Sequence, residues 1–168
     1  PQGSSLGWLK ARAKNRPAIE GIAGWREPVK AQEKPDYLIF DAPARAAGSE
    51  LNFLLRHARD IIIPVVPSPI DIRACADYIR DLMLARTALR HEGRIAVVAN
   101  RVREHTIIYD KLKRFLLGLD IPFIATLRET QNYIRAAEQG VGIFELTGGN
   151  TTADTAQWKP LLEWLERT

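Results

Sequence analysis

Short apolar runs alternate along the chain with longer stretches in which apolar residues recur at helical spacing. The apolar runs, each bounded by turn residues, lie at 37–41, 61–67, 94–100 and 122–127. Runs of this length and composition are typical of strands that are buried on both faces. Because strands and helices alternate, the pattern predicts an α/β fold with a mostly parallel, doubly wound sheet and helices on both faces. We expect a single domain over residues 1–168.

Helical spacing predicts helices between these strands and near both ends of the chain. They are expected over about 6–13, from Ser49 to Asp60, over about 71–90, from Thr106, from Thr130 to Gly140, and around Trp158 to Leu165. Cys75 lies on the inner face of the third helix and is interpreted as a small core residue. Pro64 must interrupt or end its strand, and Pro160 must lie in the first turn of the last helix or kink it.

Composition and charge narrow the class of protein. The apolar share of 46% and the charged share of 26% are ordinary for a soluble globular chain. The net charge of +4 suggests an anionic partner such as nucleic acid or a nucleotide phosphate. A single cysteine excludes an intrachain disulfide and a cysteine metal cluster. The chain shows neither a signal peptide at its start nor an apolar run long enough for a membrane span, so we expect a cytoplasmic protein.

Asp41 is the residue that most favours a catalytic interpretation. It follows the apolar run Tyr37–Phe40 and precedes a small-residue loop, Ala42-Pro43-Ala44. Ligands of open parallel sheets bind at the carboxyl ends of the strands, where this carboxylate is expected. In nucleotide hydrolases such an Asp holds Mg²⁺, usually through water, beside the terminal phosphates. An Asp that caps the next turn is the structural alternative, and the residues alone leave both open.

Five segments, in order, resemble one family. They are PQGSS with Trp8, YLIFDAPA, IIIPVVPSPID, AVVANRV and LRETQNYIRAAEQGVGIFE. The first resembles the "DPQGS…W" switch segment of ParA-type partition ATPases, and the second resembles their Walker B strand and second switch. The others resemble the "PvxPSpxD" segment, the strand that ends in Asn near the adenine, and the "R…yxxA…G…v.e" segment. The chain thus resembles the ParA/MinD-like deviant-Walker ATPases of the short type over nearly its whole length.

The resemblance implies roles for particular residues toward ATP and Mg²⁺. Asp41 would contact Mg²⁺ through water, and Gln2 and Gly3 would border the γ-phosphate. Pro43 and Gly48 would shape the second switch.

On the adenine side, the resemblance points to the end of the third predicted strand. Asn100 would face the adenine edge, since an amide can both donate and accept, and Arg101 and Val102 would flank the base. A turn residue at the end of the strand is an equally good interpretation of Asn100.

The resemblance also implies partners. The family binds DNA without sequence preference, mainly through basic side chains on phosphates. The candidates here are Lys111, Lys113, Arg114, Arg128 and Arg135. Arg128 falls on the family's Arg motif, whereas the first three are also explained by a solvated helix face. The implied protein is a nucleoid-associated homodimer with a ParB-like stimulating partner, and its cargo is a plasmid, a chromosome or a protein assembly.

The chain departs from the family at its start. No Lys- and Gly-rich Walker A loop occurs, and the chain begins at Pro1 without an initiator Met. We therefore expect the carboxyl-terminal part of a longer ATPase, with a sheet that is incomplete at its N-terminal side. As written, it should not hydrolyse ATP, because no lysine and no nest of backbone donors is left for the phosphates.

Two other functions are considered. A MinD-like membrane regulator would end in a basic amphipathic helix, but Glu163 and Glu166 balance Lys159 and Arg167 here. A partner-binding remnant without enzymatic activity is the third hypothesis. A relative of the nitrogenase iron protein is disfavoured, because one cysteine per chain cannot supply the paired ligands of a shared cluster.

Overall fold

The computed structural model describes residues 4–24, 35–43, 46–90 and 92–167. They fall into two compact units, each treated by itself below. The smaller unit comprises the chain up to Pro43 together with Gln131–Thr151, and the larger unit comprises Ala44–Thr130 together with Thr152–Thr168.

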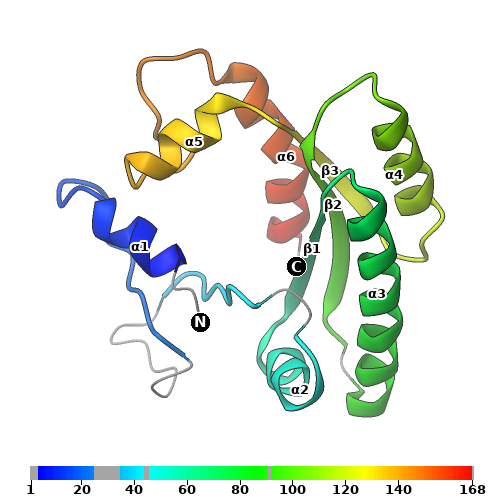
Figure 1. Ribbon diagram of the computed structural model, residues 1–168. Coiled ribbons are helices and arrows are strands. Elements are labelled where there is room, and N and C mark those ends of the chain that lie inside the picture. The colour runs from blue at the N-terminus through cyan, green and yellow to red at the C-terminus, as the bar shows by residue number, and fades with distance from the viewer. Residues whose placement is uncertain (1–3, 25–34, 44–45, 91, 168) are drawn as a thin grey trace. The chain divides into compact units, whose positions relative to one another are not determined.

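The larger unit is built on a parallel sheet (Figure 1). Its strands are β1 (Asp60–Val65), β2 (Arg94–Val102) and β3 (Phe123–Arg128), in the order β1-β2-β3. Strands β1 and β2 pair in an unbroken register from Asp60↔Arg94 to Val65↔Ala99. The pairing of β2 with β3 shifts twice, once at Val97/Val98 and once between Ala99 and Val102. The second shift falls at the carboxyl end of β2, where ligands of parallel sheets are usually bound.

The described helices of the larger unit precede, connect or follow these strands. They are α2 (Gly48–His57), α3 (Pro69–Leu89), α4 (Ile107–Leu117) and α6 (Thr152–Glu166). Two have hydroxyl caps: Ser68 accepts a hydrogen bond from the Asp71 N–H, and Thr106 accepts one from the Tyr109 N–H. These caps set the start of α3 and α4 directly after the turns that leave β1 and β2. The helix expected from Ser49 begins one residue earlier and has no side-chain cap.

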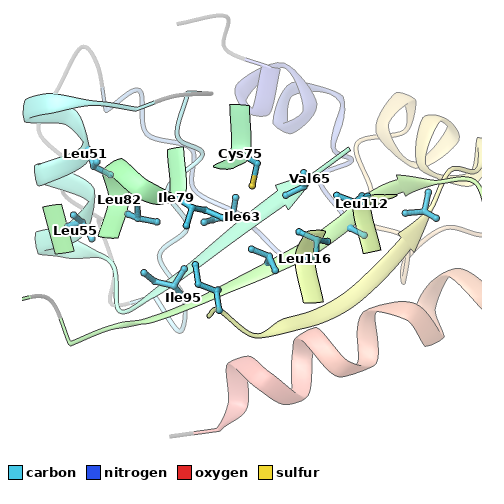
Figure 2. Packing of buried hydrophobic residues seen from close by; sticks show 14 residues of the cluster. Leu51, Leu55, Ile63, Val65, Cys75, Ile79, Leu82, Ile95, Leu112 and Leu116 are labelled. Atoms are coloured by element: carbon cyan, nitrogen blue, oxygen red, sulfur yellow. The ribbon is translucent and has the colours of Figure 1, made fainter. Parts of the chain in front are cut away.

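The main core packs α2, α3 and α4 against one side of the sheet (Figure 2). The fully buried members Leu82, Val97, Leu112 and Leu116 come from α3, β2 and α4. Cys75 is buried in the same cluster, as expected of a core residue, and burial raises the pKa of its thiol to about 11. The thiol is therefore protonated near neutral pH and is not a nucleophile.

A second cluster lies on the other side of the strands. Val98, Ala125 and Leu127 pack there against Leu161 of α6, the pale red helix in Figure 2. Since successive side chains of a strand point to opposite faces, Val97 and Val98 place the two clusters on opposite sides of β2.

The α/β class and the parallel pairing are confirmed, and three of the four predicted strands are found. The larger doubly wound sheet and the single-domain organisation stay predictions. Pro64 lies inside β1, which ends one residue later, and the register with β2 runs through it. Pro160 lies in the interior of α6, so a position in its first turn is excluded.

The predicted strand at 37–41 is wrong. No residue from Pro35 to Pro43 is in a strand, and none of the described strands pairs with this segment. Tyr37, Leu38 and Ile39 are 68%, 53% and 85% exposed. Apolar residues form a stable strand only where neighbouring backbone and a covering face receive them, and the described residues give this segment neither.

The smaller unit contains two described helices, α1 (Ser4–Ala11) and α5 (Gln131–Glu138), which contact each other. The remainder of its described residues forms turns and irregular segments. Both helices lie close to the predicted positions.

Arg94 joins the beginning of β2 to the end of α6. Its Nε donates to Asp60 Oδ1 at 2.6 Å and its Nη1 donates to the Trp164 carbonyl at 2.8 Å. The guanidinium also lies 4.4 Å from the centre of the Trp164 ring. A basic side chain that caps the last carbonyls of a helix satisfies groups that have no partner within the helix. Arg94 therefore holds α6 in place against the sheet.

We predict that Arg94→Ala lowers the free energy of unfolding by about 2 kcal/mol, the cost of removing charge-assisted hydrogen bonds from a partly buried site. Urea unfolding followed by circular dichroism measures the change. Arg80→Ala is the matched control, because Arg80 is 65% exposed and pairs with exposed carboxylates of α3. It should change stability by less than about 0.5 kcal/mol. Equal losses in the two variants would contradict the anchoring role.

Candidate functional site

Asp41 contacts the beginning of α1 in the smaller unit. The Ser5 hydroxyl donates a hydrogen bond to Asp41 Oδ2, and both residues are exposed. Ser5 closely follows Gln2 and Gly3, which lie outside the described residues. The structure thus places Asp41 against Ser5, the last residue of the PQGSS motif.

The donors at this point fit Mg²⁺ in their chemistry. A carboxylate and a hydroxyl are oxygen ligands, and Mg²⁺ is commonly held by one or two carboxylates together with water and substrate phosphates. Within the described parts of the chain, no group of three or more His, Cys, Asp or Glu residues could hold a metal ion. Any Mg²⁺ at Asp41 would therefore depend on phosphate oxygens and water for most of its ligands.

The second predicted switch is described only in part. Pro43 is exposed, Arg45 lies outside the described residues, and Gly48 begins α2. Gly48 has φ of 56°, and a Cβ added to it would meet no heavy atom within 4 Å. The backbone conformation, rather than close packing, therefore favours glycine at this position.

Arg12 and Glu145 form the best-built polar contact of the smaller unit. The two guanidinium Nη atoms each donate to one oxygen of the Glu145 carboxylate at 2.8 Å. Arg12 Nη1 also donates to the Gly140 carbonyl, and the Gly142 N–H donates to the same carboxylate. The Arg12 side chain is only 8% exposed. This pair fixes the end of α1 to the turn that follows α5.

Gly140 permits this approach. It has φ of 61°, and a Cβ there would lie 2.3 Å from the Arg12 backbone nitrogen. The sequence motif contained Glu145 but gave no indication of its partner, because Arg12 lies far from it in the chain.

The hydrogen bonds from Arg12, followed by the one from Gly142, lower the pKa of Glu145 to about 2. A carboxylate with a lowered pKa adds stability above its ordinary value of 4.5, and that stability is lost as the pH falls toward 2. We predict that Glu145→Gln lowers the melting temperature at neutral pH, and that its difference from the wild type shrinks steadily below pH 4.5. Thermal unfolding followed by circular dichroism across this range measures the difference.

Glu138→Gln is the control for Glu145→Gln, because Glu138 is an exposed residue of α5. It should leave the melting curve nearly unchanged at every pH. A Glu145→Gln difference that stays constant from neutral pH to pH 2 would contradict the ion pair as its cause.

In the larger unit, the predicted adenine-side residues lie at the carboxyl end of β2. Asn100 is half-buried, and its Oδ1 accepts a hydrogen bond from the Arg101 N–H at 3.0 Å. Arg101 is exposed and has φ of 53°, a left-handed conformation that few non-glycine residues adopt. The Val102 side chain is 1% exposed within the main core, so only its backbone can face a ligand.

Glu129 links Arg101 to Arg103 at the same edge of the sheet. Arg101 Nη2 lies 3.0 Å from Glu129 Oε1, and Arg103 Nε donates to the other carboxylate oxygen. The Glu129 N–H donates to the Val102 carbonyl, which ties the acid to β2. Hydrogen bonds from Arg103 and then Arg101 lower the pKa of Glu129. Sequence reasoning missed Arg103 and Glu129, since only the pairing of β2 with β3 brings them together.

The five predicted DNA-binding residues belong to three elements of two different units. Lys111, Lys113 and Arg114 are exposed on α4 of the larger unit. Arg135 belongs to α5 of the smaller unit and donates to the Gly148 carbonyl at 2.8 Å. The three residues of α4 are thus accessible to solvent. Both a DNA-binding role and a merely solvated helix face require this.

Arg128 has a structural partner. Its Nε donates to Asp154, the buried acid of α6, which is 0% exposed. The Arg128 N–H also donates to Gln157 Oε1 at 2.8 Å. A buried carboxylate is costly without a counterion, so part of this guanidinium is committed to the attachment of α6.

We predict that Arg128→Ala destabilises the protein by about 2–4 kcal/mol, because it removes an ion-pair partner of a buried carboxylate. The lower part of this range reflects the partial exposure of Arg128, whose side chain is 39% exposed. Replacing both partners, as Arg128→Met with Asp154→Leu, should recover much of the loss. Arg114→Ala on α4 is the control, with a change below about 0.5 kcal/mol. Urea unfolding gives all three values, and similar losses for Arg128→Ala and Arg114→Ala would contradict the structural role.

No family model matches the chain. The chain is similar to the "maintenance of carboxysome distribution protein A" of Halothiobacillus neapolitanus (strain ATCC 23641 / c2). The two are 26% identical over 162 residues, which cover 92% of this chain and 74% of that protein. The similarity supports the ParA/MinD-like relationship that the motifs indicate. In the described segments, no helix is long and apolar enough to cross a membrane.

Proposed function

We propose that this chain belongs to a ParA/MinD-like ATPase that positions or partitions a cargo in the cell. One observation carries the proposal: the chain is similar, over 92% of its length, to a protein named for the maintenance of carboxysome distribution. The ordered motifs of the sequence support it. The relative's name favours a protein assembly as cargo, whereas a plasmid or a chromosome fits the resemblance equally well.

In this proposal the complete fold is a doubly wound P-loop NTPase fold, and ATP drives dimerisation and binding to nucleoid DNA. Hydrolysis, stimulated by a ParB-like partner, would reverse both. The partner's identity would select the cargo.

Residues of this chain would act at two ends of the nucleotide. Bound ATP with Mg²⁺ would supply the phosphoryl group that is hydrolysed. Asp41 would hold a water ligand of the metal, with Ser5 fixing the orientation of its carboxylate. Gln2 and Gly3 would border the γ-phosphate, and Asn100 would orient the base through its amide. The 168 residues contain no Lys- and Gly-rich phosphate loop, so we propose that they do not hydrolyse ATP by themselves.

The test compares phosphate release by the 168-residue chain and by the full natural gene product. We expect no hydrolysis by the former and slow, DNA- and partner-stimulated hydrolysis by the latter. In the gene product, Asp41→Asn should lower kcat roughly 10–100-fold, the usual effect of losing a group that orients a metal's ligands.

Asp36→Asn is the matched control for Asp41→Asn, because it makes the same chemical change at an exposed carboxylate five residues earlier. It should leave kcat unchanged. A gene product without ATPase activity would refute the proposed function, and equal effects of the two substitutions would refute the role of Asp41.

A further inference from the structure

One carboxylate holds two exposed guanidiniums at the carboxyl end of the sheet. Arg101 and Arg103 are 66% and 77% exposed at their side chains, whereas Glu129 between them is 30% exposed. The outer faces of both arginines therefore reach solvent while Glu129 occupies their inner sides. Such exposed ion pairs contribute little to stability, so replacing the Glu129 carboxylate by another anion costs little free energy.

The backbone fixes this arrangement before any ligand arrives. The shift in pairing between Ala99 and Val102 and the left-handed conformation of Arg101 turn the chain at the end of β2. The Asn100 side chain accepts the Arg101 N–H, and the Glu129 N–H donates to the Val102 carbonyl. Arg101 and Glu129 thus emerge from hydrogen-bonded backbone, which limits the conformational entropy lost on binding.

A stretch with an excess of positive charge begins at this pair in the sequence. Residues 101–114 include Arg101, Arg103, Lys111, Lys113 and Arg114, opposed by Glu104 and Asp110. Five positive and two negative charges leave +3 in this stretch. A local excess of this kind is the electrostatic signature of a surface for a polyanion. Arg128, which the family motif indicated, is instead attached to buried Asp154.

We propose that Arg103 and Arg101, the latter in place of the base-flanking role that the resemblance implies, form a phosphate-contacting edge of the DNA surface, and that Glu129 is an internal competitor that occupies them until DNA displaces it. The inference rests on the proposed function for the choice of DNA as the polyanion. Guanidinium groups bind carboxylate and phosphate oxygens with similar geometry, so a phosphate can replace Glu129 on both arginines. The displaced carboxylate turns to solvent, and DNA counterions are released in proportion to the phosphates contacted.

The decisive experiment compares Glu129→Gln with Glu104→Gln in the full gene product with Mg-ATP. Both substitutions raise the net charge by one. Glu104 follows Arg103 directly in the sequence, whereas Glu129 contacts both arginines in space. Only Glu129→Gln removes the competitor. Fluorescence anisotropy with a labelled random-sequence DNA duplex, over a series of salt concentrations, gives affinity and salt dependence.

We expect Glu129→Gln to bind DNA about 2- to 10-fold more tightly than wild type, as the loss of two exposed ion pairs implies. Glu104→Gln should show a clearly smaller gain. The double variant Arg101→Gln with Arg103→Gln should bind more weakly, and its plot of log affinity against log salt should be shallower by about 2. All these side chains are largely exposed or at the sheet edge, and unchanged circular dichroism would verify folding.

Equal affinities of Glu129→Gln and Glu104→Gln would overturn the competitor role. If the double variant kept the wild-type affinity and slope while loss of Lys111, Lys113 and Arg114 abolished binding, this surface would be wrong and DNA binding by the protein would stand. If the wild type and every variant failed to bind DNA at low salt, the inference and the DNA-binding part of the proposed function would both fail.

Discussion

The burial of residues 95–99 in the middle of β2 is the constraint on which the larger unit depends. Ala96, Val97 and Ala99 are 0% exposed, and Ile95 and Val98 are nearly so. A parallel strand in this position has to be covered on both faces, which α3 and α4 do on one side and α6 does on the other. Polar chemistry is consequently confined to its two ends. Arg94 at one end and the Arg101–Glu129–Arg103 group at the other mark the points where the strand meets solvent.

The two ends use ion pairs for different purposes. At the amino end, Arg94 is only 30% exposed and its donors also reach carbonyls of α6, so the contact fastens one element to another. At the carboxyl end, the two arginines share a carboxylate and are mostly solvated. A partly desolvated pair resists exchange, whereas a solvated pair exchanges readily with other anions. Burial, more than the identity of the residues, separates a structural contact from an exchangeable one here.

The sequence predicted the larger unit well, because periodicity and caps are local signals. The helix expected from Thr106 is capped by that residue, and Cys75 packs in the core. Local signals failed at Tyr37–Phe40, because a strand is a property of its neighbours and no described strand pairs with these apolar residues. They gave no indication of the contact between Arg128 and buried Asp154, since the two residues are distant in sequence. For Glu129 the missing information was the register of β3 with β2.

The Arg128–Asp154 contact joins the end of β3 to the beginning of α6, although the chain between them runs through Gln131–Thr151 of the smaller unit. The larger unit thus holds together the two points at which that segment leaves and returns. A segment closed at its base in this way is an insertion in the architectural sense, and lengthening such an insertion costs only a logarithmic loss of entropy. Evolution could therefore exchange or extend Gln131–Thr151 as a module while the sheet of the larger unit stayed constant.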